Sequence, residues 1–253
     1  MLGCDRSGTS VVRRVLDSHS RIACPAEMKF MLQLLNIVSV EQSRVGLMSA
    51  GFTRREILDR LAVMIDSFLG DYAERFGKDI WVEKTTHNLF YADLLDEIFE
   101  RDVRYLGLVR HGLDVAYSLE NVEHAPFTVI ERFREEGDDR AAAAMRFWRS
   151  QNGKLLALKG ELGERLEVFK YEDIVRDPKA EFTRMFEFMG VPFEPEALDY
   201  NRHAHTGGYE DPTAVTSGRI EKGKSDFRRW EARKQRRLYA IAEVELNELG
   251  YGI

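Results

Sequence analysis

The sequence predicts an α/β fold of the P-loop-like kind, in which a mostly parallel central sheet lies between two layers of helices. Two observations lead to this prediction. Short apolar runs alternate along the chain with longer segments whose apolar residues recur at the spacing of a helix. A loop with two glycines also separates the first short strand from the first helix. Alternating strands and helices are typical of a parallel sheet covered on both faces, and we expect residues 1–253 to form a single domain.

The helices are predicted from apolar residues that share one face. In residues 54–68 such residues recur at intervals of three or four. Asp177 followed by Pro178 is typical of a helix start, and Gly190 of the end of that helix. The same reasoning predicts further helices over residues 9–19, 89–99, 114–121, 140–162 and 230–249.

The strands are predicted where an apolar run is short and polar residues follow it. Three such runs are residues 80–82, 103–109 and 166–171. Only Met1 and Leu2 precede the glycine loop, so we expect a first strand that is minimal or shortened. In a parallel sheet of this kind, ligands bind at the C-terminal ends of the strands.

The composition excludes several classes of protein. The chain is 44% hydrophobic and 32% charged, as in globular proteins, and its apolar windows are too short to span a bilayer. No secretory signal is visible, and Cys4 and Cys24 are too few for a disulfide framework. We therefore expect a soluble protein of a reducing compartment, the cytoplasm, with no membrane partner. No cysteine and histidine spacing suggests zinc.

The charge is unevenly distributed along the chain. The net charge of −6 argues against a general nucleic-acid partner. Residues 219–237 nevertheless contain nine Lys or Arg and three acidic residues, so they carry +6 and the remainder −12. A local basic segment on an acidic protein suits a small polyanionic ligand. For residues 233–237, a solvated helix face is the preferred explanation.

Residues 3–10, Gly-Cys-Asp-Arg-Ser-Gly-Thr-Ser, are typical of a phosphate-binding loop that lacks its lysine. Gly3 and Gly8 have the spacing of the G-x-x-x-x-G-K-[ST] motif, but Thr9 stands at the lysine position. The nearby positive charge is Arg6, whose guanidinium is forked rather than a point charge. Backbone N–H groups at the helix start could still bind an anion. The substitution argues against NTP hydrolysis and favours another phosphate-like group.

Polar residues also follow the other predicted strands, and the shared edge of a parallel sheet would bring them together. The strand over residues 103–109 ends in Arg110 rather than in the acid that an NTPase uses to position Mg²⁺. Glu172 and Asp173 could imitate that acid, but we expect them to cap the following helix. No metal site is therefore predicted. The polar groups at the strand ends are residues 83–88, residues 110–112 with Ser118, residues 171–173, and the basic loop at residues 219–224.

Together these segments resemble the sulfotransferases that use 3′-phosphoadenosine 5′-phosphosulfate (PAPS), closest to the branch that includes tyrosylprotein and many bacterial sulfotransferases. The resemblance extends from Met1 to about Trp230. Three positions depart from the family pattern, namely Ser20, Thr86 and His111, where the family has proline, proline and aspartate. The matching motifs are, in order, residues 6–10, 19–27, 83–88, 108–118, 171–178 and 188–192.

The resemblance implies a role for each of these groups in PAPS binding. Arg6 and the backbone N–H groups of Ser7, Gly8, Thr9 and Ser10 would hold the 5′-phosphosulfate. Lys84 would neutralise the bridging oxygen as it leaves. Arg110 and Ser118 would bind the 3′-phosphate, a task that suits the fork of an arginine, with Tyr171, Arg219 and Lys222 as further cofactor contacts. Taken singly, Lys84 could be a surface lysine, Ser118 an ordinary helix serine and Tyr171 a core tyrosine.

The acceptor side is less defined. The resemblance places Glu27 as the general base, and His87 is the rival base because imidazole titrates near neutral pH. Residues 199–218 contain three glycines and few apolar residues, which predicts a lid, a binding loop or disorder. His203 and His205 in this loop could meet the acceptor, but solvated histidines are expected.

The sequence therefore predicts a PAPS-dependent sulfotransferase that acts without a metal on a hydroxyl or amine acceptor, either a small molecule or a peptide. The acceptor and the oligomeric state are not predicted. One alternative is a P-loop nucleotide kinase or NTPase, which Thr9 opposes. The other is a non-catalytic protein that binds the product nucleotide 3′-phosphoadenosine 5′-phosphate (PAP).

Overall fold

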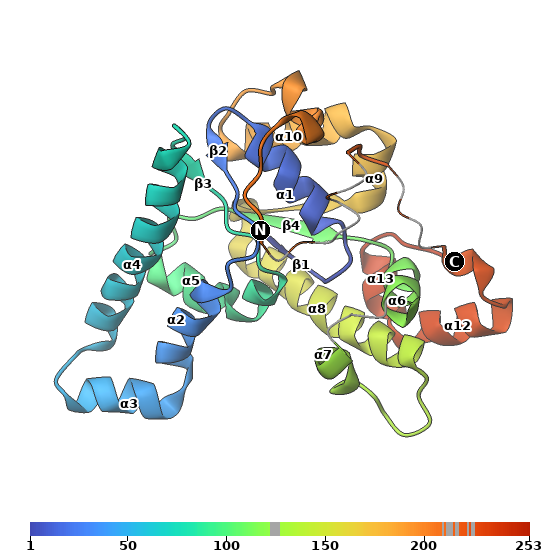
Figure 1. Cartoon of the computed structure of the whole chain (residues 1–253). Coiled ribbons are helices and arrows are strands. Elements are labelled where there is room, and N and C mark those ends of the chain that lie inside the picture. The colour runs from blue at the N-terminus through green and yellow to red at the C-terminus, as the bar shows by residue number, and fades with distance from the viewer. Residues whose placement is uncertain (122–126, 209, 211–214, 216–217, 222, 224–225) are drawn as a thin grey trace.

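The computed structural model describes residues 1–121, 127–208, 210, 215, 218–221, 223 and 226–253 (Figure 1). Lys222, a predicted cofactor ligand, and its neighbour Lys224 lie outside the described residues.

Two groups of parallel strands form the centre of the fold. Strands β1 (Leu2–Gly3), β4 (Tyr105–Val109) and β5 (Leu166–Lys170) pair in the order β1-β4-β5. Strands β2 (Ile22–Ala23) and β3 (Ile80–Trp81) form a separate parallel pair. The prediction of a mostly parallel sheet is confirmed, and the first strand spans two residues.

A cavity of about 630 Å³ lies between the two groups of strands. Its walls include Leu2 from β1, Trp81 from β3 and Tyr105 from β4. Glu83 and Asn88 of the predicted segment 83–88 also line it, whereas neither Arg6 nor Arg110 is among its lining residues.

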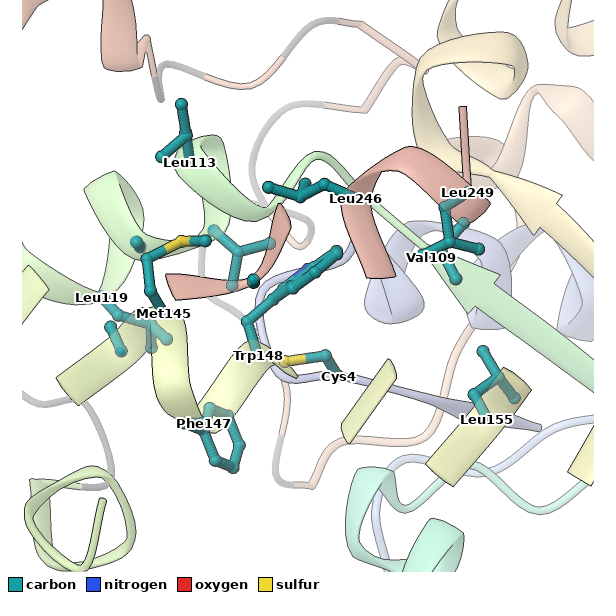
Figure 2. Packing of buried hydrophobic residues seen from close by; sticks show 14 of the residues in the cluster. Cys4, Val109, Leu113, Leu119, Met145, Phe147, Trp148, Leu155, Leu246 and Leu249 are labelled. Carbon is teal, nitrogen blue, oxygen red and sulfur yellow. The ribbon is translucent and has the colours of Figure 1, made fainter. Parts of the chain in front are cut away.

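Helices cover both faces of the three-stranded sheet, because the side chains of β4 alternate between two apolar clusters. Tyr105 and Val109 belong to the cluster around Trp148, whereas Leu106 and Leu108 belong to the cluster around Phe169. Figure 2 shows the first cluster, in which Trp148 lies among side chains from several elements. Ala92 and Ile130 of two further helices also belong to this cluster, but most of its helical residues come from α6 (Gly112–Asn121), α8 (Arg140–Leu162), α12 (Ala232–Ile241) and α13 (Glu243–Glu248).

The opposite face is covered by the helix that follows the glycine loop and by the helix that follows β5. Helix α1 (Thr9–Ser18) contributes Val12, Val15 and Leu16. Helix α10 (Pro178–Met189) contributes Phe182, Met185 and Phe186. The predicted ends of α10 are confirmed, since Asp177 accepts a bond from the N–H of Ala180 and Gly190 is left-handed. The short helix α9 (Tyr171–Arg176) connects β5 to α10.

A third group of helices packs beside β2 and β3 and extends away from the sheet at the left of Figure 1. Its longest member is α4, which the capping box of Thr53 and Glu56 starts. Helix α4 continues beyond the predicted end at residue 68 because Leu69 and Ala73 are also buried. The group comprises α2 (Phe30–Ser39), α3 (Glu41–Ser49), α4 (Arg54–Arg75) and α5 (Ala92–Ile98).

Other predicted boundaries are wrong in ways that local chemistry explains. The segment 230–249 is two helices, because Ala242 leaves the helical region at φ −132°. The segment 89–99 begins instead with a 3₁₀ turn, η1 (Thr86–Tyr91), which precedes α5. Helices α2 and α3 were not predicted. Four further 3₁₀ turns and one short helix complete the fold: η2 (Gly163–Arg165), η3 (Pro195–Leu198), η4 (Tyr200–Arg202), η5 (Phe227–Arg229) and α7 (Phe127–Glu131). Among the described residues, no helix is both long and apolar enough to cross a membrane.

Candidate active site

The loop between β1 and α1 has the geometry of an anion-binding loop. Gly8 has φ +91° and precedes α1 without providing a side-chain cap. A Cβ atom at Gly8 would lie 2.5 Å from the ring of Tyr171, so both the dihedral and the space require glycine. An uncapped helix start leaves its first N–H groups to an external acceptor such as an anion.

Three residues predicted from different motifs meet at this loop. The Nε of Arg6 donates to the Oγ of Ser118 over 3.0 Å, although 112 residues separate them. Arg110 Nη1 donates to the backbone carbonyl of Arg6 over 3.1 Å. The structure therefore brings Arg6, Arg110 and Ser118 together, as the predicted convergence of strand ends requires.

Tyr171 packs against the cluster formed by Arg6, Arg110 and Ser118. The guanidinium of Arg110 lies over the Tyr171 ring, 4.6 Å from its centroid. The Tyr171 hydroxyl donates to the carbonyl of Glu221 and accepts from the N–H of Gly223 over 2.8 Å. Tyr171 thus holds Gly223 close to Arg110. The backbone carbonyl of Arg219 accepts a hydrogen bond from the Tyr200 hydroxyl. The cofactor contact of Arg219 stays a prediction.

Two buried polar atoms at this cluster have no hydrogen-bond partner among the described residues. They are the Oγ of Ser7 and the Nε of Arg110. Ser7 is fully buried in the loop, and Arg110 is 6% exposed. Buried polar atoms are nearly always paired in folded proteins. Their position marks where a ligand with acceptor oxygens would complete the site.

Lys84 and Glu27 form a second cluster, after β3 and β2. Lys84 Nζ lies 2.7 Å from the Oε1 of Glu27, and their side chains are 1% and 17% exposed. Such burial rules out the interpretation of Lys84 as a surface lysine. The two residues predicted to act on the reacting group are therefore in direct contact.

Glu83 and Asn88 organise the turn that presents Lys84, a role that sequence reasoning did not assign. The Glu83 carboxylate accepts from the Thr85 hydroxyl over 2.6 Å and from the Asn88 side-chain amide. Burial raises the pKa of Glu83, against the hydrogen bond from Thr85, which lowers it. The sequence signal that could have indicated this turn is the spacing of glutamate, threonine and asparagine in residues 83–88.

The two clusters are linked through the glycine loop. Thr86, which stands where the family has proline, donates its hydroxyl to Asp5 Oδ1 over 2.6 Å. Asp5 belongs to the loop that carries Arg6. This hydrogen bond fixes the Lys84 turn relative to the loop, so the departure from the family pattern has a structural purpose.

His111, another departure, is a structural residue. Its Nδ1 accepts from the N–H of Leu113, and its Nε2 lies 2.7 Å from the carbonyl of Gly252. The backbone N–H of His111 donates to Glu172 over 2.9 Å. The predicted capping role of Glu172 is therefore wrong, since its carboxylate is bound by His111 and by Tyr251.

The remaining histidines differ in their surroundings. His87 is half-buried beside Thr86, close to the Lys84 turn, and stays a rival base. His203 Nε2 contacts the carbonyl of Glu196 near the surface. For His205 the expectation of a solvated side chain is wrong, because its side chain is 4% exposed and lies 2.6 Å from Asp17.

The described part of the chain contains no group of three histidine, cysteine, aspartate or glutamate side chains that could hold a metal ion. The acids nearest the cluster of Arg6 and Arg110 have other partners. Asp114 accepts from the N–H of Phe227 over 3.3 Å. Burial raises the pKa of Asp114, and the charge of Arg110 opposes that rise.

The fold and the candidate site together define an α/β protein with a phosphate-loop-like glycine loop at the C-terminal edge of a parallel sheet. The model of the sulfotransferase family matches residues 1–195, so the chain belongs to that family.

Individual proteins are similar to the chain at a lower level. Protein-tyrosine sulfotransferase A of Caenorhabditis elegans is 27% identical over 79% of this chain and 51% of its own length. The nodulation protein NoeE of Sinorhizobium fredii is 27% identical over 78% of this chain and 50% of its own length. The chain thus spans about half the length of these curated relatives. The solved sulfotransferase domain from the curacin biosynthetic pathway is 20% identical, with a TM-score of 0.70, over 100% of this chain and 96% of that domain. This likeness supports the fold.

Proposed function

We propose that the chain is a PAPS-dependent sulfotransferase that transfers a sulfuryl group to a hydroxyl or amine acceptor. The observation that carries the proposal is the convergence of Arg6, Arg110 and Ser118 at an uncapped helix start, linked through Asp5 to the Lys84 and Glu27 pair. A nucleotide with two separate anionic groups matches this distribution of cations.

The residues present fit such a nucleotide. Ser7 Oγ and Arg110 Nε supply buried donors that the described chain leaves without partners. Arg110 offers the fork that recognises phosphate oxygens, and Tyr171 keeps its guanidinium stacked. Gly223, held by Tyr171, allows the backbone to approach Arg110, since a Cβ there would lie 3.5 Å from Arg110 Nη2.

When bound, the donor supplies a sulfuryl group on a phosphate oxygen, and negative charge grows on that oxygen as the sulfur–oxygen bond breaks. Arg6 and Lys84 stabilise this charge, which is the main contribution that fixed cations make to such transfers. Glu27 takes the proton that the acceptor oxygen or nitrogen loses as it bonds to sulfur. The ion pair couples these two events, because protonated Glu27 releases the charge of Lys84 for the leaving oxygen.

Calorimetry with PAP tests the nucleotide part of the proposal. We expect binding in the micromolar range, and weaker binding of adenosine 5′-phosphate, which lacks the 3′-phosphate. A folded protein that does not bind PAP at high micromolar concentration would contradict the proposal. A protein that binds PAP but never consumes labelled PAPS with any acceptor of a broad screen would be a non-catalytic binder.

Replacement of the base tests the catalytic part. Glu27→Gln removes the proton acceptor but keeps the size of the side chain, so turnover should fall by about 10²-fold or more while PAP affinity changes little. The matched variant is His87→Gln. If His87→Gln loses turnover and Glu27→Gln keeps it, the base is His87.

A further inference from the structure

Residues 200–208 lie against α1 rather than extending into solvent, and one buried histidine accounts for this position. His205 comes from the segment predicted to be a mobile or binding loop. Its Nδ1 lies 2.6 Å from Asp17 Oδ2, and its Nε2 lies 2.8 Å from the carbonyl of Tyr200. Both ring nitrogens therefore face an acceptor.

The imidazolium donates to both oxygens at once, and Arg13 Nη1 also lies 3.3 Å from Nδ1. In either neutral tautomer one ring nitrogen carries a lone pair, which would then face an oxygen at 2.6 or 2.8 Å. The orientation also excludes His205 as a general base, because Nε2 is already bound to the Tyr200 carbonyl. The positive charge of the His205 ring is paired with the Asp17 carboxylate.

The surroundings of Asp17 favour its ionised form and orient its carboxylate toward His205. Burial alone would raise its pKa, but the hydrogen bonds from His205 and from the N–H of Cys24 lower it below the usual value. Cys24 N donates to Asp17 Oδ1 over 2.9 Å, which orients the carboxylate so that Oδ2 faces His205. The acceptor is therefore fixed by α1 and by the end of β2.

Two arginines of α1 hold the same segment further along. Arg13, which is fully buried, donates to the carbonyl of Thr206 over 3.3 Å, and its Nε lies 3.0 Å from Glu210. Arg14 binds the other oxygen of Glu210 at 3.0 Å. Arg13 and Arg14 follow the glycine loop by one helical turn, so this segment is attached to the helix that starts at the predicted anion site.

The attached segment adjoins the Glu27 side of the site. A Cβ atom at Gly208 would lie 2.6 Å from the Cβ of Ala26, the residue before Glu27. The hydroxyls of Thr206 and Tyr72 lie 2.8 Å apart, which connects the segment to α4. The position of residues 200–208 thus shapes the surface beside Glu27.

We propose that His205 and Asp17 are positioning residues, whose ion pair holds residues 200–208 against α1 and Ala26 while His205 is protonated. The inference rests on the proposed function, since it assigns this segment to the acceptor side of the transfer site. As pH rises and His205 loses its proton, the segment should detach and the acceptor should bind more weakly.

The charges around His205 define this dependence. Two of these groups contact the ring directly, Asp17 Oδ2 at 2.6 Å and Arg13 Nη1 at 3.3 Å from Nδ1. The titratable and charged groups that face this cluster are Arg13, Arg14 and Asp17 of α1, Cys24 after β2, Tyr72 of α4, Lys78 before β3, and Glu210.

Amide hydrogen exchange on the full chain tests the attachment. Peptides that cover residues 200–208 should lose protection by about tenfold or more between about pH 5.5 and 8.5, after correction for intrinsic exchange, because a hydrogen-bonded charge is lost. His205→Gln should show low protection at every pH. His203→Gln is the matched control, since it removes a histidine two residues away whose Nε2 contacts only the Glu196 carbonyl among the described residues. It should keep the wild-type pH dependence.

A kinetic measurement tests the consequence for the acceptor side. With PAP and 4-nitrophenyl sulfate as probes of the reverse transfer, the KM for the aryl sulfate should rise with pH in the wild type but not in His205→Gln. The affinity for PAP should be the same in both proteins. An aryl sulfate KM that has the same pH dependence in both proteins overturns the positioning role.

The exchange data overturn the attachment itself if protection at residues 200–208 is independent of pH or equal in the two histidine variants. Protection of β4 and α8 peptides shows whether each variant is folded. Failure of PAP to bind contradicts the proposed function, whereas the exchange result still decides the attachment.

Discussion

The two sides of the candidate site are built differently. The loop side consists of residues 3–10 with Arg110, Ser118 and Tyr171, all of which lie at or shortly after the end of a strand of the three-stranded sheet. The Glu27 side consists of residues 24–30, helix α4 and the segment 200–208. These parts meet only through contacts between elements distant in sequence, such as Tyr72 with Thr206.

The loop side rests directly on the core. The indole N–H of Trp148 donates to the carbonyl of Arg110 over 3.0 Å, and a Cβ at Gly112 would lie 3.0 Å from the same indole. Figure 2 shows Trp148 next to Cys4 of the glycine loop. The backbone of Arg110, whose guanidinium would bind an anion, is thus supported by a buried apolar cluster.

The Glu27 side leaves apolar surface exposed. Phe68 of α4 is 55% exposed although its ring pairs with Phe30 at 5.3 Å. Lys29 precedes α2 with φ +56°, a conformation that a lysine adopts only when its surroundings impose it. The comparison teaches that one side is made rigid by the sheet, whereas the other depends on long-range attachments such as His205 with Asp17.

The largest expected effect is at Lys84, where the two sides meet. Lys84→Met should lower turnover by about 10²–10³-fold, because it removes a fixed charge at the developing anion. Lys154→Met, which removes the exposed ion pair with Asp93, is the control and should keep normal turnover. The measurement is the consumption of labelled PAPS with an acceptor from the screen. More than a tenth of the wild-type turnover in Lys84→Met would separate Lys84 from the chemistry.

Asp17→Asn tests the attachment of the Glu27 side. It should lower the free energy of unfolding by about 3 kcal/mol at neutral pH, since it leaves buried cations without their partner. The pKa of Asp17 is lowered in the fold, so its contribution is present above its unfolded value and is lost as pH falls through the folded value. Urea unfolding of both proteins between about pH 3 and 7 should show the difference shrink below about pH 4. A constant difference at all pH values would contradict this prediction.

Gly8→Ala tests the rigidity of the loop side. The substitution should cost about 2 kcal/mol, because the left-handed backbone is strained and the added Cβ meets the Tyr171 ring. Gly77→Ala is the matched control: Gly77 also has positive φ, but nothing lies within 4 Å of its added Cβ, so the cost should be about 1 kcal/mol. Thermal unfolding measures both. Equal effects would show that Tyr171 does not press on the loop.

Arg110→Lys has the smallest expected effect and concerns specificity. Lysine keeps the charge but loses the fork and the stacking on Tyr171, so PAP should bind about tenfold more weakly. Adenosine 5′-phosphate, which lacks the 3′-phosphate, should bind with unchanged affinity. Calorimetry with both nucleotides makes the comparison. Equal weakening of both would move Arg110 away from the 3′-phosphate.

The sequence by itself determined the α/β class, most helices and the loop side of the site. Those features depend on local geometry: helix α8 follows its apolar periodicity, α10 starts at Asp177 and ends at Gly190, and polar residues after parallel strands share one edge. The proximity of Arg6, Arg110 and Ser118 is therefore predictable from the sequence.

Only the tertiary structure decided the division of the strands into two groups, the helical pair α2 and α3, and the Glu27 side. The burial of His205 depends on Asp17, which lies 188 residues earlier in the chain. Lys84 meets Glu27 across 57 residues. Such contacts leave no periodic signal in the sequence, because the partner of each residue is set by how separate elements pack.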